Sequence, residues 1–176
     1  RRVTAPGTSQ KAVPRYEYDR AGNRTAVIDP AGNIIYRRYD NANRKIAEYF
    51  ATKYFAEDPN LSRCAAVLKR QLVYHPDDSL AAETVYDYDG STVLSHTEFD
   101  YDDRGRLTQV REVLDPPGGS AADSAVTRFE YLDCSSEREN YEIVITDAAN
   151  KQTRLSYDAQ GNEIRRTHPD GCTEQF

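Results

Sequence analysis

The chain has 176 residues and a formal net charge of −6. This length corresponds to one domain or to one part of a larger protein. The excess of 29 Asp and Glu over 23 Lys and Arg argues against nucleic acid as the main partner, because phosphate binding needs clustered basic charge. No apolar run reaches the roughly 18 residues that a membrane helix needs.

Tyrosine decides whether this chain can form a core. Leu, Ile, Val and Phe together make up less than a fifth of the residues, a level at which charged chains are often disordered. The 13 tyrosines restore enough large side chains for a core, and tyrosine favours strands. Composition therefore predicts a folded chain of mainly β structure.

An Asp-x-x-Gly tetrad recurs along the chain, with Asn in place of Gly in some copies. Asp at the first position bonds a backbone N–H two residues on, and Gly or Asn at the fourth accepts a positive φ. Each tetrad is predicted to reverse the chain between two antiparallel strands. The turn residues are Asp19, Gly22, Asp29, Gly32, Asp40, Asn43, Asp102, Gly105, Asp147, Asn150, Asp158 and Gly161.

Aromatic and acidic residues alternate before several of these tetrads, as in Tyr16-Glu17-Tyr18. A period of two places both rings on one face of a strand. Stacked hairpins would then align the rings as cross-strand ladders. The predicted ladder residues are Tyr16, Tyr18, Tyr39, Tyr86, Tyr88, Phe99, Tyr101, Phe129, Tyr131 and Tyr157.

We predict one continuous repeat segment of about eight to twelve short antiparallel strands in three parts. Residues 1–50 and 86–176 form hairpins, and residues 51–85 form a divergent insertion or degenerate repeat. Asp58-Pro59 would begin a short helix near residues 59–72, since Leu61, Ala65, Leu68 and Leu72 share one helical face. The alternative there is degenerate strands with a long loop. Residues 116–125 are predicted to form an extended hairpin loop.

These motifs resemble the Rhs/YD-repeat family over residues 13–50 and 97–171. The resemblance rests on Tyr18-Asp19 with Gly22, Tyr39-Asp40, Tyr101-Asp102 with Gly105, and Tyr157-Asp158 with Gly161. It implies a segment of a spiralling β-shell, as in bacterial Rhs proteins, Tc toxins and teneurins. It also implies a secreted or cell-surface location, with neighbouring YD repeats and an encapsulated toxin or cargo domain as partners.

The leading functional hypothesis is structural: the chain forms part of the wall of a container around a toxin or other cargo. We expect no enzymatic activity and no cofactor. The alternative is an extracellular adhesion module whose exposed aromatic faces bind glycans or a partner protein. Because Met is absent, we expect an excised or processed segment, whose unpaired terminal strands would allow edge-to-edge self-association.

Other candidate chemistry is better explained by structure. Autocleaving members of the family carry paired Asp-Pro-x-Gly motifs, but Asp29-Pro30 and Asp115-Pro116 lie far apart within ordinary repeats, which favours turns. Asp100, Asp102 and Gly105 fit part of a calcium loop, yet Arg111 stands where its last carboxylate is needed.

Neither the histidines nor the cysteines have a spacing typical of a site. His75, His96 and His168 are scattered, so we expect no catalytic residues. Cys64, Cys134 and Cys172 form no CxxC pair, so we expect no metal site. Buried free thiols are the simplest interpretation, and one disulfide with one free cysteine stays open.

Overall fold

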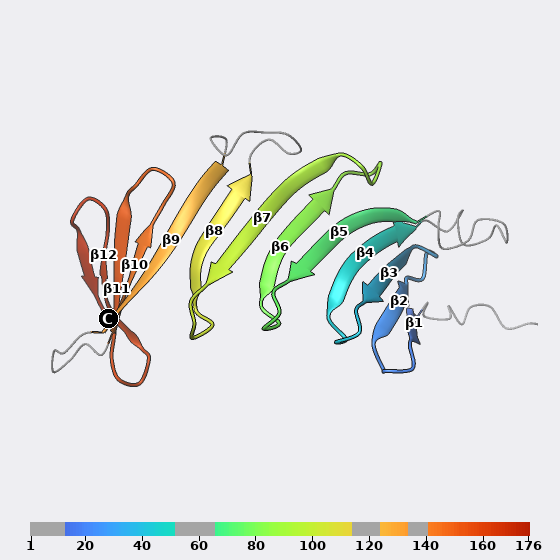
Figure 1. Cartoon of the computed structure of the whole chain (residues 1–176), viewed down its shortest axis with the longest axis horizontal. Coiled ribbons are helices and arrows are strands. Elements are labelled where there is room, and N and C mark those ends of the chain that lie inside the picture. Colours follow the sequence, from blue (N-terminus) through green and yellow to red (C-terminus); the bar gives the residue numbers. More distant parts are fainter. Residues whose placement is uncertain (1–12, 52–65, 114–123, 134–140) are drawn as a thin grey trace, which may run out of the picture. The chain divides into compact units, whose positions relative to one another are not determined.

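Thirteen strands follow one another in a single antiparallel sheet (Figure 1). The computed structural model describes residues 13–51, 66–113, 124–133 and 141–176. Each strand pairs with the next one in the chain, in the order β1 to β13. The mainly β, hairpin-repeat prediction is confirmed, and the number of strands is slightly above the predicted range.

The strands are short and separated by tight turns or by segments outside the described residues. They are β1 (Arg15–Tyr18), β2 (Arg24–Ile28), β3 (Ile34–Tyr39), β4 (Lys45–Ala51), β5 (Val67–Tyr74), β6 (Leu80–Tyr86), β7 (Val93–Tyr101), β8 (Leu107–Val113), β9 (Ser124–Asp133), β10 (Tyr141–Thr146), β11 (Gln152–Tyr157), β12 (Glu163–Thr167) and β13 (Thr173–Gln175). None of the described ranges contains a helix that could cross a membrane.

The segment predicted as divergent contains a β-hairpin. Strands β5 and β6 lie in its second half, and Leu68 pairs with Tyr49 of β4. The alternative of degenerate strands is therefore correct here, and the helix prediction is wrong over residues 67–72, because cross-strand pairing overrides the helical spacing of the leucines. The beginning of that helix, at residues 59–65, lies outside the described residues. Ser124 and Ala125 belong to β9, so the predicted loop over 116–125 ends earlier.

The chain divides into two compact units. Unit 1 contains residues 1–71 and 88–91, and unit 2 contains residues 72–87 and 92–176. In unit 1, Ala26, Ile34 and Ala51 form a buried cluster, against which Tyr36 packs.

Unit 2 buries few side chains completely. Leu72 and Val144 are its buried hydrophobic residues among those described, and Ser156 is buried beside Arg165, whose Nη2 lies 3.3 Å from the serine hydroxyl. One sheet leaves both of its faces open unless another layer covers them. The sparse core follows from this architecture.

Candidate functional site

The tetrads form one recurring turn. Gly22 donates its amide to the carbonyl of Asp19 at 3.2 Å, and Asp19 donates to the carbonyl of Asn23 at 3.0 Å. The fourth residue has a positive φ, which is 87° at Gly22 and 62° at Asn43. This geometry is a type I turn followed by a left-handed bulge residue. The same pair of backbone bonds occurs in the turns that begin at Asp29, Asp40, Asp102, Asp147 and Asp158.

The aspartate side chain holds each turn from inside. Oδ1 of Asp19 accepts the backbone amides of Ala21 and Asn23, both at 2.9 Å. Such paired bonds to the second and fourth residues on also occur at Asp40, Asp102, Asp147 and Asp158. An aspartate at this position therefore satisfies backbone donors that the turn leaves out of the sheet.

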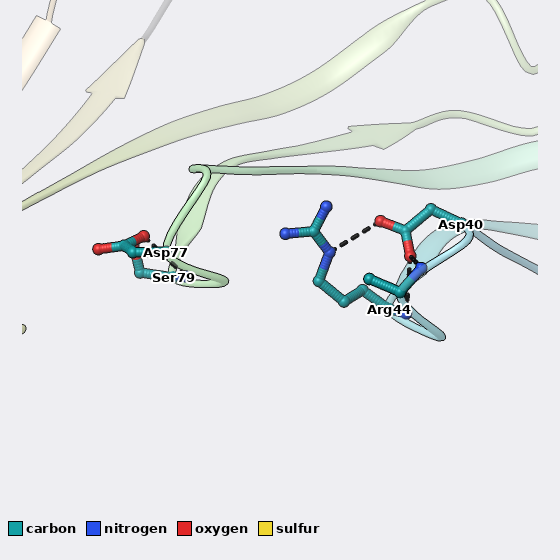
Figure 2. Close-up of polar contacts among 5 residues, drawn as sticks. Asp40, Arg44, Asp77 and Ser79 are labelled. Atoms are coloured by element: carbon teal, nitrogen blue, oxygen red, sulfur yellow. Dashed lines mark hydrogen bonds and ion pairs between the residues drawn. The ribbon is translucent and has the colours of Figure 1, made fainter.

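The residue that follows the tetrad has a role that the sequence did not predict. Asn23 donates its side-chain amide to Oδ2 of Asp19 at 3.0 Å. Nε of Arg44 lies 2.7 Å from Oδ2 of Asp40 (Figure 2). Asn33, Arg106 and Asn162 make the corresponding contact in their turns. The recurrence of Asn or Arg immediately after the tetrad was the available signal.

These donors favour the charged form of the turn carboxylates. The pKa values of Asp19, Asp29 and Asp158 lie below the ordinary 3.8, first because the side-chain amide of the asparagine after the tetrad donates to each carboxylate. The pKa values of Asp40 and Asp102 are lowered first by the backbone N–H of the arginine after the tetrad. The turns are therefore held by carboxylates that stay ionised in the folded chain.

Two further turns begin with histidine and were not predicted. In the turn that begins at His75, Oδ1 of Asp77 accepts the backbone amide of Ser79 at 3.1 Å and its hydroxyl at 2.6 Å (Figure 2). In the turn at residues 168–171, Oδ1 of Asp170 likewise accepts the backbone amide of Cys172 at 2.9 Å. The shared signal is His-Pro-Asp, which moves the bonding carboxylate to the third position of the turn.

The predicted ladder residues mostly face aliphatic partners. Phe99 is opposite Val110, and Tyr131 is opposite Ile143. Tyr157 stacks on Tyr141, with ring centroids 4.8 Å apart and an 8° interplanar angle. The other ladder residues pair as Tyr16 with Val27, Tyr18 with Arg24, Tyr39 with Lys45, Tyr86 with Val93, Tyr101 with Leu107 and Phe129 with Ile145.

Three ladder residues are exposed. The exposed fractions are 47% for Tyr16, 61% for Tyr18 and 82% for Tyr88. Tyr88 lies outside the strands, and Nζ of Lys69 is 4.2 Å from the centre of its ring. Alternation along a strand thus places rings on a common face without telling which of them are covered.

Two tyrosine hydroxyls connect neighbouring hairpins. The hydroxyl of Tyr39 donates to the carbonyl of Arg24 at 3.0 Å, and that of Tyr131 donates to the carbonyl of Leu107 at 3.0 Å. Both acceptors are the first residue of the strand that follows an aspartate turn. The guanidinium of Arg106 also lies 4.3 Å from the centre of the Tyr131 ring. These contacts tie one hairpin to the turn of the hairpin before it.

A β-bulge accompanies the tyrosine that precedes a turn. The pairing register shifts immediately before Tyr18, Tyr39, Tyr101 and Tyr157. The pairs β2–β3 and β10–β11, whose turns have no preceding tyrosine, keep a continuous register. Because a bulge bends the strand and increases its twist, the Tyr-Asp hairpins are locally more twisted.

Register divides the side chains of unit 2 between two different faces, since directly paired residues share a face. We call one of them the aromatic face, and its residues are Phe99, Tyr101, Val110, Phe129, Tyr131, Tyr141, Ile143, Ile145, Leu155 and Tyr157. All of them are half-buried. The opposite face carries the ion pairs Glu98–Arg111 at 3.1 Å and Glu142–Arg154 at 3.0 Å.

The described residues contain no group of three or more His, Cys, Asp or Glu that could hold a metal ion. The carboxylates of the partial calcium loop have other contacts, because Oδ2 of Asp100 accepts from Gln109 at 2.9 Å and Asp102 holds its turn. Cys172 is a free thiol but is exposed, so the expected burial is wrong for this residue, which lies next to a turn. Cys64 and Cys134 lie outside the described residues.

Known proteins contain the same kind of repeat and the same fold. A family model described as RHS Repeat matches residues 143–173, which include the turns at Asp147 and Asp158. The crystal structure of TcdB2-TccC3-TEV is similar to 93% of this chain and 8% of that chain, with 15% identity and a TM-score of 0.55. The Tc holotoxin pore of Photorhabdus luminescens matches 92% of this chain and 9% of that chain, with 13% identity and a TM-score of 0.39.

No curated protein matches the chain in sequence. The chain spans less than a tenth of the length of the two solved chains above. The predicted resemblance to the Rhs/YD-repeat family is confirmed by the RHS repeat and by the fold shared with TcdB2-TccC3-TEV.

Proposed function

We propose that this chain, an RHS-repeat segment with the fold of part of TcdB2-TccC3-TEV, forms part of the wall of a β-shell that encloses a toxin or other cargo domain. Closing a sheet around the cargo would shield it from solvent and from proteases until delivery. The proposal assigns activity to the enclosed domain, gives this chain no catalytic role and needs no cofactor.

The observation that carries the proposal is the aromatic face of a sheet that forms a single layer over the residues that the structure describes. An apolar sheet face is stable in water only when another layer or a partner covers it. In unit 2 the aromatic face runs over β7 to β11 and stays half-buried, while the opposite face carries ion pairs. A wall with chemically different sides suits a container, in which one side contacts the contents or a neighbouring layer.

Neighbouring repeats are the proposed partners at the sheet edges. In the described sheet, β1 and β13 each have one paired neighbour, and every residue of β1 is exposed. Further hairpins of the same type would continue the hydrogen-bonding pattern on these edges. We keep the predicted organisation of one continuous repeat segment, in which residues 1–50, 51–85 and 86–176 are successive parts of one wall.

Protease protection of the cargo tests the shell. In the full-length protein that contains this segment, the cargo domain should resist a protease concentration that digests the same domain expressed alone. Combining Gly105→Val and Gly161→Val should weaken two turns and speed cargo digestion. The variant Arg104→Ala, which changes an exposed turn residue, should leave the protection intact. Equal digestion of enclosed and free cargo would contradict the proposal.

Secretion or display on the cell surface is part of the same proposal, because a container for a toxin acts at its point of delivery. Fractionation of cells that produce the full-length protein tests this. The segment should be found in the medium or be removed by protease added to intact cells. Recovery only from the cell interior, under conditions in which the cargo acts on other cells, would contradict it.

A second candidate function is surface recognition of glycans or proteins. The exposed rings of Tyr16 and Tyr18, next to each other on one side of β1, favour it. A glycan array probed with the wild-type chain and with Tyr16→Ala combined with Tyr18→Ala discriminates between the candidates. Binding that the double variant loses would support recognition, and absence of binding across the array would count against it.

A further inference from the structure

We propose that a polar hollow in unit 2 binds a small oxyanion, namely a carboxylate or phosphate group carried by a small molecule. The hollow has a volume of about 430 Å³. This is within the range of roughly 300–1,000 Å³ that is usual for ligand pockets. The residues whose side chains matter for the proposal are Asn150, Lys151, Gln152, Arg154, Thr167 and His168. The proposal is independent of the shell function.

The meander brings these residues together. Asn150 ends the turn before β11, and His168 begins the turn after β12. Between them, Arg154 of β11 is the register partner of Thr167 of β12, so their side chains share one face. Residues from two successive hairpins thus line one hollow.

Three basic side chains gather here in a chain that is acidic overall. Arg154 bonds to Glu142 at 3.0 Å, and Nε2 of His168 lies 3.3 Å from Oε1 of Glu174. Among the described residues, Lys151 has no ion-pair partner. The carboxylates of the two turns, Asp147 and Asp170, accept backbone amides. Arg154 and His168 are therefore already engaged with Glu142 and Glu174, and Lys151 is the basic side chain of the hollow that is left for a ligand.

Lys151 departs from the pattern of the other aspartate turns. At the same position, Asn23, Asn33, Arg44, Arg106 and Asn162 each bond Oδ2 of their turn aspartate. Lys151 donates only its backbone amide to Asp147, at 2.8 Å, so its ammonium group is available to a ligand. The turn keeps its shape without that side chain, which frees the residue for another role.

Neutral donors complete the hollow. The side chains of Asn150, Gln152 and Thr167 form no hydrogen bond with the described residues around them. Amide N–H and hydroxyl groups beside lysine and arginine match the several acceptor oxygens of a carboxylate or phosphate. The lining contains no Phe, Tyr or Trp ring, so an uncharged sugar would lack the large stacking surface that it usually uses.

A titration followed by ¹H–¹⁵N spectra of the 176-residue chain tests the site. The probes are inorganic phosphate, glucuronate as a carboxylate, and glucose as the uncharged control. We expect saturable shifts confined to the residues of the hollow for one or both anions and none for glucose. Added salt should weaken the binding, because the site is exposed. Phosphate and glucuronate titrated separately show which oxyanion is preferred.

Lys151→Asn is the decisive variant, because asparagine is the residue that other turns use at this position. The variant should fold with unchanged spectra elsewhere and bind the preferred anion at least about tenfold more weakly, as expected for loss of a charged hydrogen bond. Lys45→Gln, which removes a lysine paired with Glu48 in unit 1, should bind like the wild type. Unchanged affinity in Lys151→Asn, equal shifts with glucose, or no saturation at tens of millimolar would overturn the proposal.

Discussion

At the scale of single residues, the turn aspartate holds the reversal between two strands through its hydrogen bonds. One carboxylate accepts two backbone amides through Oδ1 and a side-chain donor through Oδ2, as at Asp19 and Asp40. The left-handed residue that follows completes the reversal. Loss of either the charge or the left-handed residue should therefore weaken a turn without disturbing a core.

Replacing Gly105 separates backbone strain from packing. Its φ is +75°, and a Cβ added there would meet no atom within 4 Å, so any cost comes from the backbone. Gly105→Val should lower the free energy of unfolding by about 1–3 kcal/mol, measured by urea denaturation. Gly105→Asn should cost clearly less, because Asn43 and Asn150 already hold this conformation. Equal effects of Val and Asn would contradict the assigned turn.

The turn carboxylates predict loss of stability in acid. The pKa values of Asp19, Asp102 and Asp158 are lowered in the folded chain, so around the ordinary value of 3.8 the folded state binds fewer protons than the unfolded one. The stabilisation is complete above that pH and is lost as the pH falls through the folded pKa values. The melting temperature of the wild-type chain should fall between pH 5 and pH 3. The decrease should be smaller in the double variant Asp19→Asn, Asp102→Asn, which lacks two of these carboxylates. Asp103→Asn, at an exposed turn position, serves as the control.

At the scale of elements, the hairpins are connected by side chains that reach from one to the next. In unit 1, Asn23 donates to Asn43 at 2.8 Å, from the turn of one hairpin to the turn of the next hairpin. In unit 2, Asp102, Arg106 and Tyr131 form a chain of contacts from a turn to the following hairpin. The repeat is thus a unit of assembly as well as a unit of folding, which is the behaviour of solenoid-like proteins.

The hydroxyl of Tyr131 tests this connection. Tyr131→Phe keeps the ring beneath Arg106 but removes the bond to the carbonyl of Leu107. We expect the free energy of unfolding to fall by about 0.5–1.5 kcal/mol, the usual net contribution of a hydrogen bond. Tyr16→Phe, at an exposed ring, should have almost no effect in the same denaturation experiment. An effect of equal size in both variants would remove the special role of Tyr131.

At the scale of the whole molecule, the described sheet ends in two strands with one neighbour each. The edge strand β1 is fully exposed and carries two tyrosines. Open strand edges pair readily with other strands. This property would serve assembly within a larger shell and would cause association of the chain on its own.

Light scattering after size-exclusion chromatography measures this tendency. The 176-residue chain should show an apparent mass that rises with concentration. Tyr16→Lys combined with Tyr18→Lys should reduce the association, since like charges on an edge disfavour pairing. The same change at Tyr88, which lies outside the strands, should not reduce it. A constant monomer mass over a wide concentration range would reject edge pairing.

Local sequence was enough to predict the β class of the chain and the turns that begin with aspartate, although not the two turns that begin with histidine. Each tetrad, such as Asp19 to Gly22, acts through bonds and φ preferences that span only a few residues, so its outcome does not depend on distant partners. The alternation of side chains along a strand is also a local property, and it correctly predicted that Phe99 and Tyr101 share one face. The helical spacing of Leu68 and Leu72 misled because pairing with β4 is not visible in local sequence.

Contacts between side chains of different hairpins could not be predicted from the local sequence. The stacking of Tyr157 on Tyr141, the bond from Tyr39 to Arg24 and the hollow beside Lys151 all depend on register. Register in turn depends on bulges that shift the pairing by one residue. Because one residue of shift moves a side chain to the opposite face, contacts between hairpins follow from the assembled sheet and not from the repeat alone.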